Sequence, residues 1–415
     1  MIRVKPDLKY NFLRTVLSIT LIITFLAGSS ILHAQETANP SPGFYHQIRS
    51  GLLNCKIRFE KEKFGRVAFL GGSITYNPGW RDSICAYLVR RFPRTQFEFI
   101  NAGIPSMGST PAAFRLERDV LSKGRVDLLF EEAAVNDASN ARSSTEQIRA
   151  MEGIIRHLRY SNPGMNIIMM YFVDPDKIKD YEMGLTPSVI KNHEKVARDY
   201  DIPTINLALE VTERIRKGEF NWEDDFRDLH PSPFGQSIYA RSMIRFLDDT
   251  FSAKVNDDDM FTNFAMPDKM DEYCYDRGEL IDISKPELVN GWNINPTWTP
   301  EDEAGVRSNY HHVPMLVSNQ PGSLLRFKFK AKAIGIAVAA GPDAGMIEYR
   351  IDVGDWQHLN LFTPWSMHLH LPWYYTLSAE LAEKEHVLEL RTSKMKDERS
   401  KGYSCRIRYI FINEN

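Results

Sequence analysis

The sequence of 415 residues has no surplus of basic residues, because 51 lysines and arginines stand against 54 aspartates and glutamates, a formal net charge of −3. A protein that binds nucleic acid needs a basic surplus or patch to neutralise phosphates, so this balance argues against nucleic acid as a partner. Internal repeats and low-complexity tracts are also absent. With 43% hydrophobic and 25% charged residues, the composition excludes a disordered or collagen-like chain, and the length suggests two globular domains.

Cysteine is scarce, and the spacing of the four cysteines does not fit a zinc site. In an exported chain they could form disulfides, for which four cysteines allow three pairings, whereas a chain of this length builds a sufficient core without them. We therefore favour buried free thiols. The four residues are Cys55, Cys85, Cys274 and Cys405.

Motifs for cofactors are missing as well. The sequence contains neither the GxxxxGK[ST] loop that binds nucleotide phosphates nor the HExxH helix of zinc proteases. Its close pairs of histidines, His311 with His312 and His368 with His370, are too isolated in the sequence to indicate a metal site. We therefore predict neither a metal nor an organic cofactor.

The first 34 residues have the pattern of a secretory signal peptide. Four basic residues precede an uncharged, largely apolar run over 16–32, and the small residue Ala34 follows it. An uncleaved membrane anchor is the alternative, since the run is near the lower length limit for a spanning helix. Removing residues 1–34 takes away four basic residues and one acidic residue and leaves a net charge of −6. We expect an exported protein, periplasmic or secreted, with no stable membrane insertion once the signal is removed.

After a mixed leader over 35–62, short apolar runs alternate with segments of helical periodicity. Strands that are apolar on both faces belong in a parallel sheet covered by helices, so we predict an α/β domain over 63–255. Ser144 and Thr186 are the expected caps of two of its helices. The expected strands are 66–72, 96–103, 126–134, 165–173 and 203–207, and the expected helices are 80–92, 111–123, 144–160, 187–200 and 233–251.

Residues 265–415 have the pattern of an all-β sandwich, jelly-roll-like, because helical periodicity fades near residue 255 and strand-like segments follow at 323–340, 346–353, 386–393 and 405–413. We expect this second domain to pack on the first and to shape one wall of its cleft. Its aromatic residues would either stack on sugars, as in a glycan-binding module, or fill the core, which we favour. They are Trp292, Trp298, Trp356, Trp365, Trp373, Tyr374 and Tyr375.

Polar and small residues follow the predicted strands of the first domain at their carboxyl ends, where ligands bind in such sheets. Ser73 comes after two glycines at the end of the first strand, the small residues 101–109 follow the second, and Asn136 follows the third. His230 lies among acidic residues just before the last helix, where a histidine can serve as general base. A serine becomes a nucleophile only beside a base and an oxyanion stabiliser, and these positions together predict such a site.

The order of these blocks resembles the SGNH (GDSL-type) hydrolases over about residues 65–250. Ser73 in GGSIT matches the nucleophile block, Asn136 in AVND the third block, and His230 in DLHPS the last. The resemblance implies a flavodoxin-like three-layer α/β/α domain and a serine esterase without a metal. In the implied mechanism Ser73 attacks an ester carbonyl, His230 takes its proton, and the N–H groups of Ser73 and Ser106 with the amide of Asn136 hold the oxyanion.

The sequence departs from the family pattern at several positions. Gly72 stands where the family has Asp, and Ser106 stands where it has the oxyanion Gly, although a serine keeps the backbone N–H. The acid of the triad is expected three residues before the histidine, and that position holds Arg227. Either Asp228, which we favour, or Asp225 would then orient the histidine, or a Ser–His dyad would operate.

These observations together predict an exported serine esterase that removes acyl groups, with acetyl favoured, from a polysaccharide or oligosaccharide. One alternative is an acylhydrolase of the lipase or lysophospholipase type, although the loop over 174–186 is too charged for an apolar lid. The other is a non-catalytic glycan-binding protein with a degenerate esterase domain, which the missing acid at Arg227 motivates.

Overall fold

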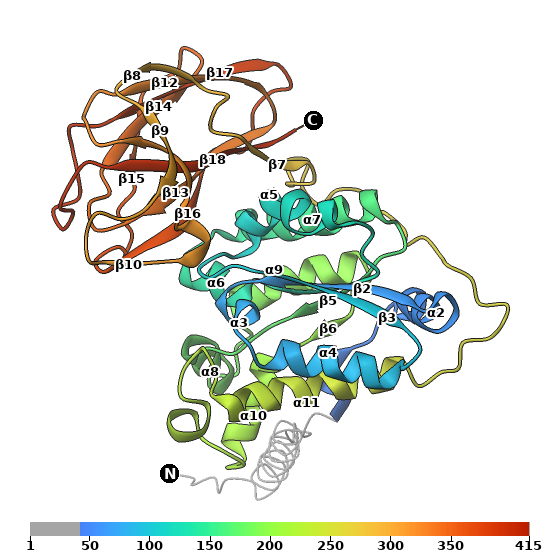
Figure 1. Ribbon diagram of the computed structural model, residues 1–415. Coiled ribbons are helices and arrows are strands. Elements are labelled where there is room, and N and C mark those ends of the chain that lie inside the picture. Colours follow the sequence, from blue (N-terminus) through green and yellow to red (C-terminus); the bar gives the residue numbers. More distant parts are fainter. Residues whose placement is uncertain (1–41, 415) are drawn as a thin grey trace, which may run out of the picture. The chain divides into compact units, whose positions relative to one another are not determined.

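A computed structural model describes residues 42–414 of the chain (Figure 1). The predicted signal peptide, residues 1–34, lies outside the described residues. The first sheet has six strands in the order β1-β6-β5-β4-β2-β3, and all neighbours run parallel except β1, which pairs antiparallel with β6. The predicted parallel α/β fold is confirmed, and the sheet begins inside the segment expected as a leader. Its strands are β1 (His46–Gln47), β2 (Phe64–Gly71), β3 (Gln96–Gly103), β4 (Leu128–Glu132), β5 (Asn166–Met170) and β6 (Thr204–Ile205).

Helices cover both faces of this sheet. In Figure 1, α5, α7 and α9 lie on one face, and α4 and α11 lie on the other. Strands buried on both faces therefore explain the continuous apolar runs of the sequence. The longer helices are α4 (Trp80–Arg91), α5 (Ser109–Asp119), α7 (Ser144–Ser161), α9 (Ser188–Asp199), α10 (Leu207–Arg216) and α11 (Pro233–Thr250).

The N-caps of two helices differ from the prediction. Ser143, and not Ser144, is the N-cap of α7, and its Oγ accepts a hydrogen bond from a backbone N–H of the first turn. Pro187, and not Thr186, precedes α9, which has no side-chain cap. Both differences are one residue long, within the usual uncertainty of helix ends read from a pattern.

Several short helices replace expected loops. The shortest, α3 (Ser73–Tyr76), begins at the serine singled out above, and α6 (Ala134–Ser139) contains Asn136, which was expected in a loop. The charged segment after β5 folds into α8 (Pro175–Glu182), and α2 (Leu53–Ile57) lies between β1 and β2. Elements of four to eight residues give too little periodicity to be distinguished from loops.

Aromatic side chains fill the core around the strand that ends at the candidate site. The rings of Phe69 in β2 and Phe130 in β4 stack with centroids 5.2 Å apart, and Trp80 of α4 lies 5.5 Å from Phe172. All four side chains are fully buried. Burying each of them stabilises the fold by roughly 1.5–3 kcal/mol, which fixes the end of β2 in place.

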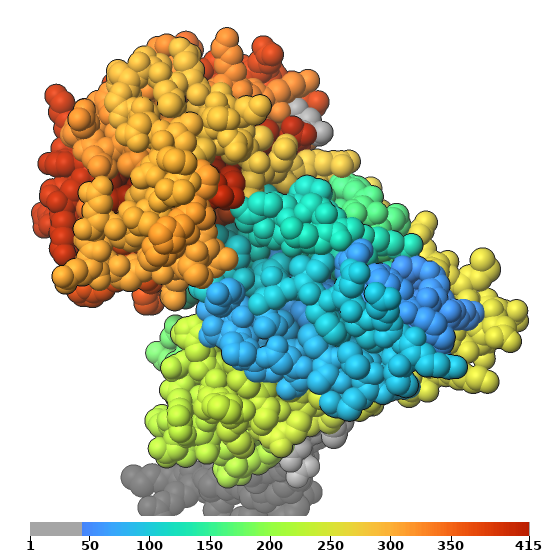
Figure 2. Space-filling model, viewed as in Figure 1, coloured from blue at the N-terminus to red at the C-terminus, as the bar shows by residue number. Residues whose placement is uncertain are grey.

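Residues 251–277 run along the outer surface of the α/β domain and connect it to the second domain. They include the yellow atoms at the right of Figure 2. Backbone carbonyls of this segment accept hydrogen bonds from side chains of the α/β domain. Asn54 Nδ2 donates to Thr262 at 2.7 Å, and Arg159 Nη1 donates to Ala265 at 2.9 Å. The connection is therefore docked on the domain.

The second domain consists of two β-sheets that enclose a separate apolar core. One sheet has seven strands, in the order β10-β16-β13-β18-β11-β9 with β7 beside β18, and the other has five, in the order β15-β14-β17-β12-β8. All pairs are antiparallel except β10 with β16. The predicted all-β domain is thus confirmed. Its strands are β7 (Gly278–Ile281), β8 (Glu287–Asn290), β9 (Asn293–Trp298), β10 (Gly305–Val306), β11 (Val313–Ser318), β12 (Leu324–Lys330), β13 (Ala333–Ala340), β14 (Met346–Ile351), β15 (Gln357–Asn360), β16 (Leu369–Ser378), β17 (Glu385–Thr392) and β18 (Cys405–Asn413).

The segment over 323–340, expected as one strand-like stretch, forms two strands in different sheets, β12 and β13. The aromatic residues singled out in the sequence also lie in different environments. Trp292, Trp298 and Tyr374 are buried in cores, as favoured above, whereas Trp365 is 53% exposed. Trp356, Trp373 and Tyr375 are half-buried. The exposed ring of Trp365 is free to stack on a ligand.

The second domain packs on α5 through strands β7 and β18. The rings of Phe114 and Phe411 lie with centroids 4.3 Å apart, both fully buried. Gly278 approaches α5 so closely that a Cβ there would lie 2.8 Å from the carbonyl oxygen of Ala113. Arg142 Nη2 also donates to the carbonyl of Tyr374 in β16 at 2.9 Å. These contacts hold β16 beside the carboxyl edge of the parallel sheet.

All four cysteines are free thiols, and three of them are buried, so the prediction of free thiols is confirmed. None of the helices formed by residues 42–414 combines the length and apolar character that a membrane span requires.

Candidate active site

Ser73 stands at the turn from β2 to α3, at the carboxyl edge of the sheet. It is the first residue of α3, after the N-cap Gly72, so its backbone N–H is among those that lack a partner within the helix. Its Oγ lies 2.7 Å from Nε2 of His230. Through a contact of this length an imidazole can take the proton of a serine nucleophile.

His230 lies in the loop before α11, and a π-helical turn and an aromatic contact anchor this loop. The turn η4 (Trp222–Phe226) ends at the buried Phe226, whose ring centroid lies 5.5 Å from that of Tyr239 in α11. Arg227 follows with a φ of 79°, a conformation rare for a residue other than glycine. The loop thereby returns to the sheet edge and brings the imidazole to the serine.

The carboxylates near His230 do not form a hydrogen-bonded triad with it. Asp228 Oδ1 lies 3.6 Å from His230 Nδ1, beyond hydrogen-bond range, and accepts a hydrogen bond from the backbone N–H of His230 instead. Asp225 turns away, because its Oδ2 accepts a hydrogen bond from the backbone N–H of Asn221 at 2.8 Å. Asp228 therefore faces the imidazole as a nearby charge, and its role as the orienting acid stays a prediction.

The surroundings of His230 lower its pKa. Burial is the largest cause, since it disfavours the imidazolium form, whereas the charge of Asp228 raises the pKa and that of Arg307 lowers it. The net direction is downward from the ordinary value. The imidazole is therefore in its neutral form, which accepts a proton, at neutral pH.

Ser106 lies in the loop between β3 and α5 with a φ of 70°, in the left-handed region that favours glycine. This is the position at which the family has Gly, so the serine occupies a glycine conformation. Asn140 Nδ2 donates to the carbonyl of Ser106 at 3.0 Å and ties the loop to the end of α6. Ser106 lines the same cleft as Ser73 and Asn136.

Gly72 gives Asn136 access to the nucleophile turn. A Cβ at position 72 would lie 1.9 Å from Asn136 Oδ1, far inside van der Waals contact. The glycine that replaces the family's Asp thus leaves the space that the Asn136 carboxamide fills. The three residues predicted to stabilise an oxyanion lie together, and that role stays a prediction.

A buried polar network supports the residues that carry this site. Asp137, next to Asn136 on α6, accepts hydrogen bonds from the backbone N–H of Ser109 at 2.8 Å and from its Oγ at 2.6 Å. His193 Nε2 of α9 lies 2.9 Å from the same carboxylate, and all three side chains are fully buried. The network joins α5, α6 and α9, and it was not predicted, because distant residues of this kind give no local sequence signal.

Arg115 holds the backbone that leads into the nucleophile turn. Its side chain is fully buried, and its Nη2 donates to the carbonyl of Gly71 at 3.2 Å while Nη1 pairs with Asp119 at 2.8 Å. A buried charge is stable only when it is paired, and Asp119 pairs this one. The hydrogen bond of the guanidinium to Gly71 then fixes the backbone just before Ser73.

The cleft that contains Ser73 and His230 has walls from both domains, as the sequence predicted for the second domain, and a volume of about 140 Å³. The second domain contributes Arg307 and Trp365, together with two leucines of β16. Arg307 had no recognisable signal in the sequence. The lining residues are Ser73, Ser106, Val135, Asn136, Ser139, Asn140, Leu229, His230, Arg307, Trp365, Leu369 and Leu371.

Within residues 42–414, one group of side chains has the composition and spacing of a metal site. Asp302, Asp343 and His370 lie together in the second domain. None of them lines the cleft around Ser73.

Residues 69–238 match the GDSL-like lipase/acylhydrolase family. This range contains Ser73, Ser106, Asn136 and His230, the residues brought to the cleft from the α/β domain. No curated protein matches the sequence.

The fold is similar to that of a two-domain esterase active on acetylated mannans, with 19% sequence identity over 89% of this chain and 97% of that one. The TM-score is 0.71 for its co-crystal structure with mannopentaose and 0.72 for a second crystal structure. An acetylxylan esterase from Geobacillus stearothermophilus matches 44% of this chain and 94% of its own, with 16% identity and a TM-score of 0.35.

Proposed function

On the premise that residues 69–238 match the GDSL-like lipase/acylhydrolase family, we propose that the chain is a carboxylic ester hydrolase that removes acetyl groups from a carbohydrate. The observation that carries the proposal is the contact of 2.7 Å between Ser73 Oγ and His230 Nε2 in a cleft shared by both domains. That contact also favours an active enzyme over a degenerate one.

In the proposed mechanism Ser73 Oγ attacks the carbonyl carbon of the ester while His230 Nε2 takes its proton. The N–H groups of Ser73 and Ser106 and the carboxamide of Asn136 stabilise the tetrahedral oxyanion. His230 then gives its proton to the leaving alcohol, and a water molecule, activated by the same imidazole, releases the acyl group from Ser73. Asp228 stabilises the imidazolium by its charge.

The size of the cleft supports acetyl as the acyl group. Its volume of about 140 Å³ is close to that of an engineered cavity of about 150 Å³ that binds benzene, so it accommodates a group of few atoms. Apolar side chains from both domains, Val135, Leu229 and Leu371, line it and suit a methyl group. A long acyl chain of the kind that a lipase hydrolyses needs a larger apolar surface.

The wall formed by the second domain supports a carbohydrate as the alcohol component. Trp365 lines the cleft and is 53% exposed, so its ring is free to stack on a sugar. The similar two-domain esterase is active on acetylated mannans and was co-crystallised with mannopentaose. A polysaccharide substrate would agree with the export expected from the N-terminal sequence.

We expect the purified chain to release acetate from acetylated mannan or xylan, measured as free acetate over time. Trp365→Ala is expected to raise KM for the acetylated glycan about tenfold, because an aromatic contact contributes about 0.5–1.5 kcal/mol beyond its buried area. The same variant should leave kcat/KM for p-nitrophenyl acetate within about twofold, since that ester has no sugar to stack.

Trp356→Ala is the matched control, because this tryptophan of the same domain lies beside Arg350 and Arg391 and does not line the cleft. It should behave as the wild type with both substrates. A chain that hydrolyses octanoyl esters faster than acetyl esters would instead be an acylhydrolase of the lipase type. Equal KM values for the glycan in wild type and Trp365→Ala would exclude the stacking role.

The lowered pKa of His230 sets an expected pH dependence. Protonated imidazole cannot accept the proton of Ser73, so kcat/KM for p-nitrophenyl acetate should fall as the pH drops through this pKa, with a midpoint below about 6.5. Asp228→Asn removes the charge that raises the pKa and should move the midpoint to lower pH. Activity is measured across pH 4–8 at constant ionic strength, with roughly half-unit steps.

Asp225→Asn is the control for this experiment, because its carboxylate bonds to the backbone of Asn221, and it should leave the midpoint in place. If Asp228→Asn left the midpoint in place, the fall of kcat/KM at low pH would be due to the protonation of another group. Glu132 is one such group, since burial raises its pKa to about 7.

A further inference from the structure

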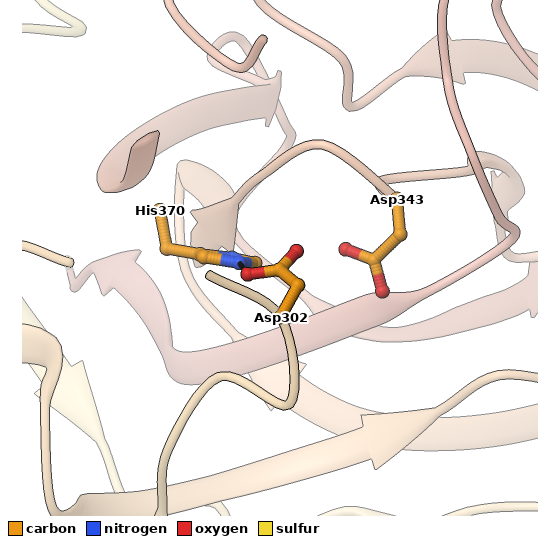
Figure 3. Close-up of side chains that lie close together, drawn as sticks. All are labelled: Asp302, Asp343 and His370. Atoms are coloured by element: carbon orange, nitrogen blue, oxygen red, sulfur yellow. Dashed lines mark hydrogen bonds and ion pairs between the residues drawn. The ribbon is translucent and has the colours of Figure 1, made fainter. Parts of the chain in front are cut away.

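The second domain brings together three metal-ligating side chains from separate segments of the chain, drawn in Figure 3. Asp302 lies in the loop before β10, Asp343 in the turn after β13, and His370 in β16. We propose that these residues bind a divalent transition-metal cation of the Zn²⁺ type. The site was not predicted from the sequence, because His370 meets its partners only through the sheet topology.

The distances suit a shared cation. One ligand atom from each residue lies within 4.8 Å of the other two, and His370 Nε2 is 2.9 Å from Asp302 Oδ1. Nitrogen and oxygen ligands bind zinc at about 2.0–2.2 Å, so two ligands of one tetrahedral ion stand about 3.3–3.5 Å apart. Small side-chain rotations would bring the three atoms to these separations.

Two polar atoms of the cluster have no hydrogen-bond partner among the described residues. His370 is 1% exposed, and its Nδ1 is unpartnered, as is Oδ1 of Asp343. Buried polar atoms of native proteins are nearly always paired, so each unpaired one indicates a missing partner. A cation bound by Nε2 of His370 and by Asp302 supplies the partner that Oδ1 of Asp343 lacks, whereas Nδ1 of the same ring points away from such an ion.

The other oxygen of Asp343 is already held. Its Oδ2 accepts hydrogen bonds from Ser404 Oγ at 2.7 Å and from Arg406 Nη2, which fixes the carboxylate and leaves Oδ1 for a cation. Hydrogen bonds of this kind orient the carboxylate ligands of metals. The two carboxylates are negative, the guanidinium of Arg406 is positive, and the neutral imidazole adds no charge. The cluster therefore has one net negative charge, which favours a cation.

The ligand types select the class of metal. Imidazole suits zinc and other first-row transition metals, whereas calcium and magnesium prefer oxygen ligands alone. Asp302 is on the accessible side, with a side chain 37% exposed, and offers the entry path. Three protein ligands leave at least one position for water.

A bound cation would act on the wall of the cleft, and not on the ester. It would tie the loop of Asp302 to β16, whose residues on either side of His370, Leu369 and Leu371, line the cleft. The backbone N–H of Arg307, another lining residue, donates to the carbonyl of His370 at 3.0 Å. The site therefore has a structural role, independent of the proposed hydrolysis.

The test measures Zn²⁺ binding to the chelator-treated chain by calorimetry and by metal content after dialysis. We expect the wild type to bind about one Zn²⁺ per chain and to unfold at a higher temperature with Zn²⁺ than without it. Asp302→Asn, in an exposed loop, should weaken Zn²⁺ binding about tenfold or more and abolish most of the thermal shift. His370→Ala should do the same, and far-ultraviolet circular dichroism checks that each variant is folded.

The chain offers a matched control in a second Asp–His pair. Asp352 Oδ2 lies 2.9 Å from His386 Nδ1, and Asp352 is about as exposed as Asp302, but no further carboxylate among residues 42–414 completes a cluster. Asp352→Asn should therefore bind Zn²⁺ as the wild type does. The proposal is overturned if the wild type binds no Zn²⁺, if Asp302→Asn and His370→Ala bind it equally well, or if Ca²⁺ binds more tightly. Metal content does not depend on esterase activity, so this result is separate from the proposed function.

Discussion

Replacing Ser73 by alanine is expected to lower kcat/KM for p-nitrophenyl acetate by about a thousandfold or more, because it removes the nucleophile that forms the acyl intermediate. Ser73 Oγ is the hydroxyl that lies 2.7 Å from His230 Nε2. The alanine side chain is smaller and keeps the backbone N–H, so the fold and part of the oxyanion contact should remain. Rates are measured by release of p-nitrophenolate and, for the glycan, by free acetate.

Ser122→Ala serves as the matched control for this substitution. Its hydroxyl donates to the carbonyl of Arg118 on an exposed surface away from the cleft, so the variant should hydrolyse both substrates at the wild-type rate. If Ser73→Ala retained the wild-type rate, the activity would have another source. The non-catalytic alternative raised by Arg227 would then become the better reading of this domain.

The parallel sheet could be predicted well from the sequence because its strands are apolar on both faces. The bounds expected for 96–103 and 405–413 are those of β3 and β18. Elements without a long periodic pattern could not be predicted, and α6 with its six residues is the example that matters for the site. Asn136 was identified by its place after a strand, although the element that holds it was not.

The contacts within the site depend on side chains far apart in the sequence. The approach of Ser73 to His230 spans 157 residues, and that of Tyr76 to Ser308 across the two domains spans 232. The contact of Ser73 with His230 could be predicted, because Ser73 follows a strand, His230 precedes a helix, and such loops meet at the carboxyl edge of a parallel sheet. Nothing comparable predicted Arg307, which reaches the cleft from another domain.

Asn136→Ala is expected to lower kcat for p-nitrophenyl acetate about a hundred- to thousandfold, with little change in KM. The carboxamide is proposed to hold the oxyanion, which exists only in the tetrahedral intermediate and the transition states around it, and losing one such donor costs about 3–4 kcal/mol. Asn192→Ala is the matched control, since the amide of this α9 residue donates to Oε1 of Gln147 in α7, does not line the cleft and should be dispensable for hydrolysis.

A second substitution tests the position of Asn136 while leaving it in the chain. In Gly72→Ala the new Cβ would stand 1.9 Å from Asn136 Oδ1, so the carboxamide must move away from the nucleophile turn. The φ of Gly72 is −91°, outside the left-handed region that favours glycine. We expect a loss in kcat close to that of Asn136→Ala, and the double variant should be no slower than either single one, because both remove the same contact. Losses that multiply in the double variant would show that Gly72 acts through something other than Asn136.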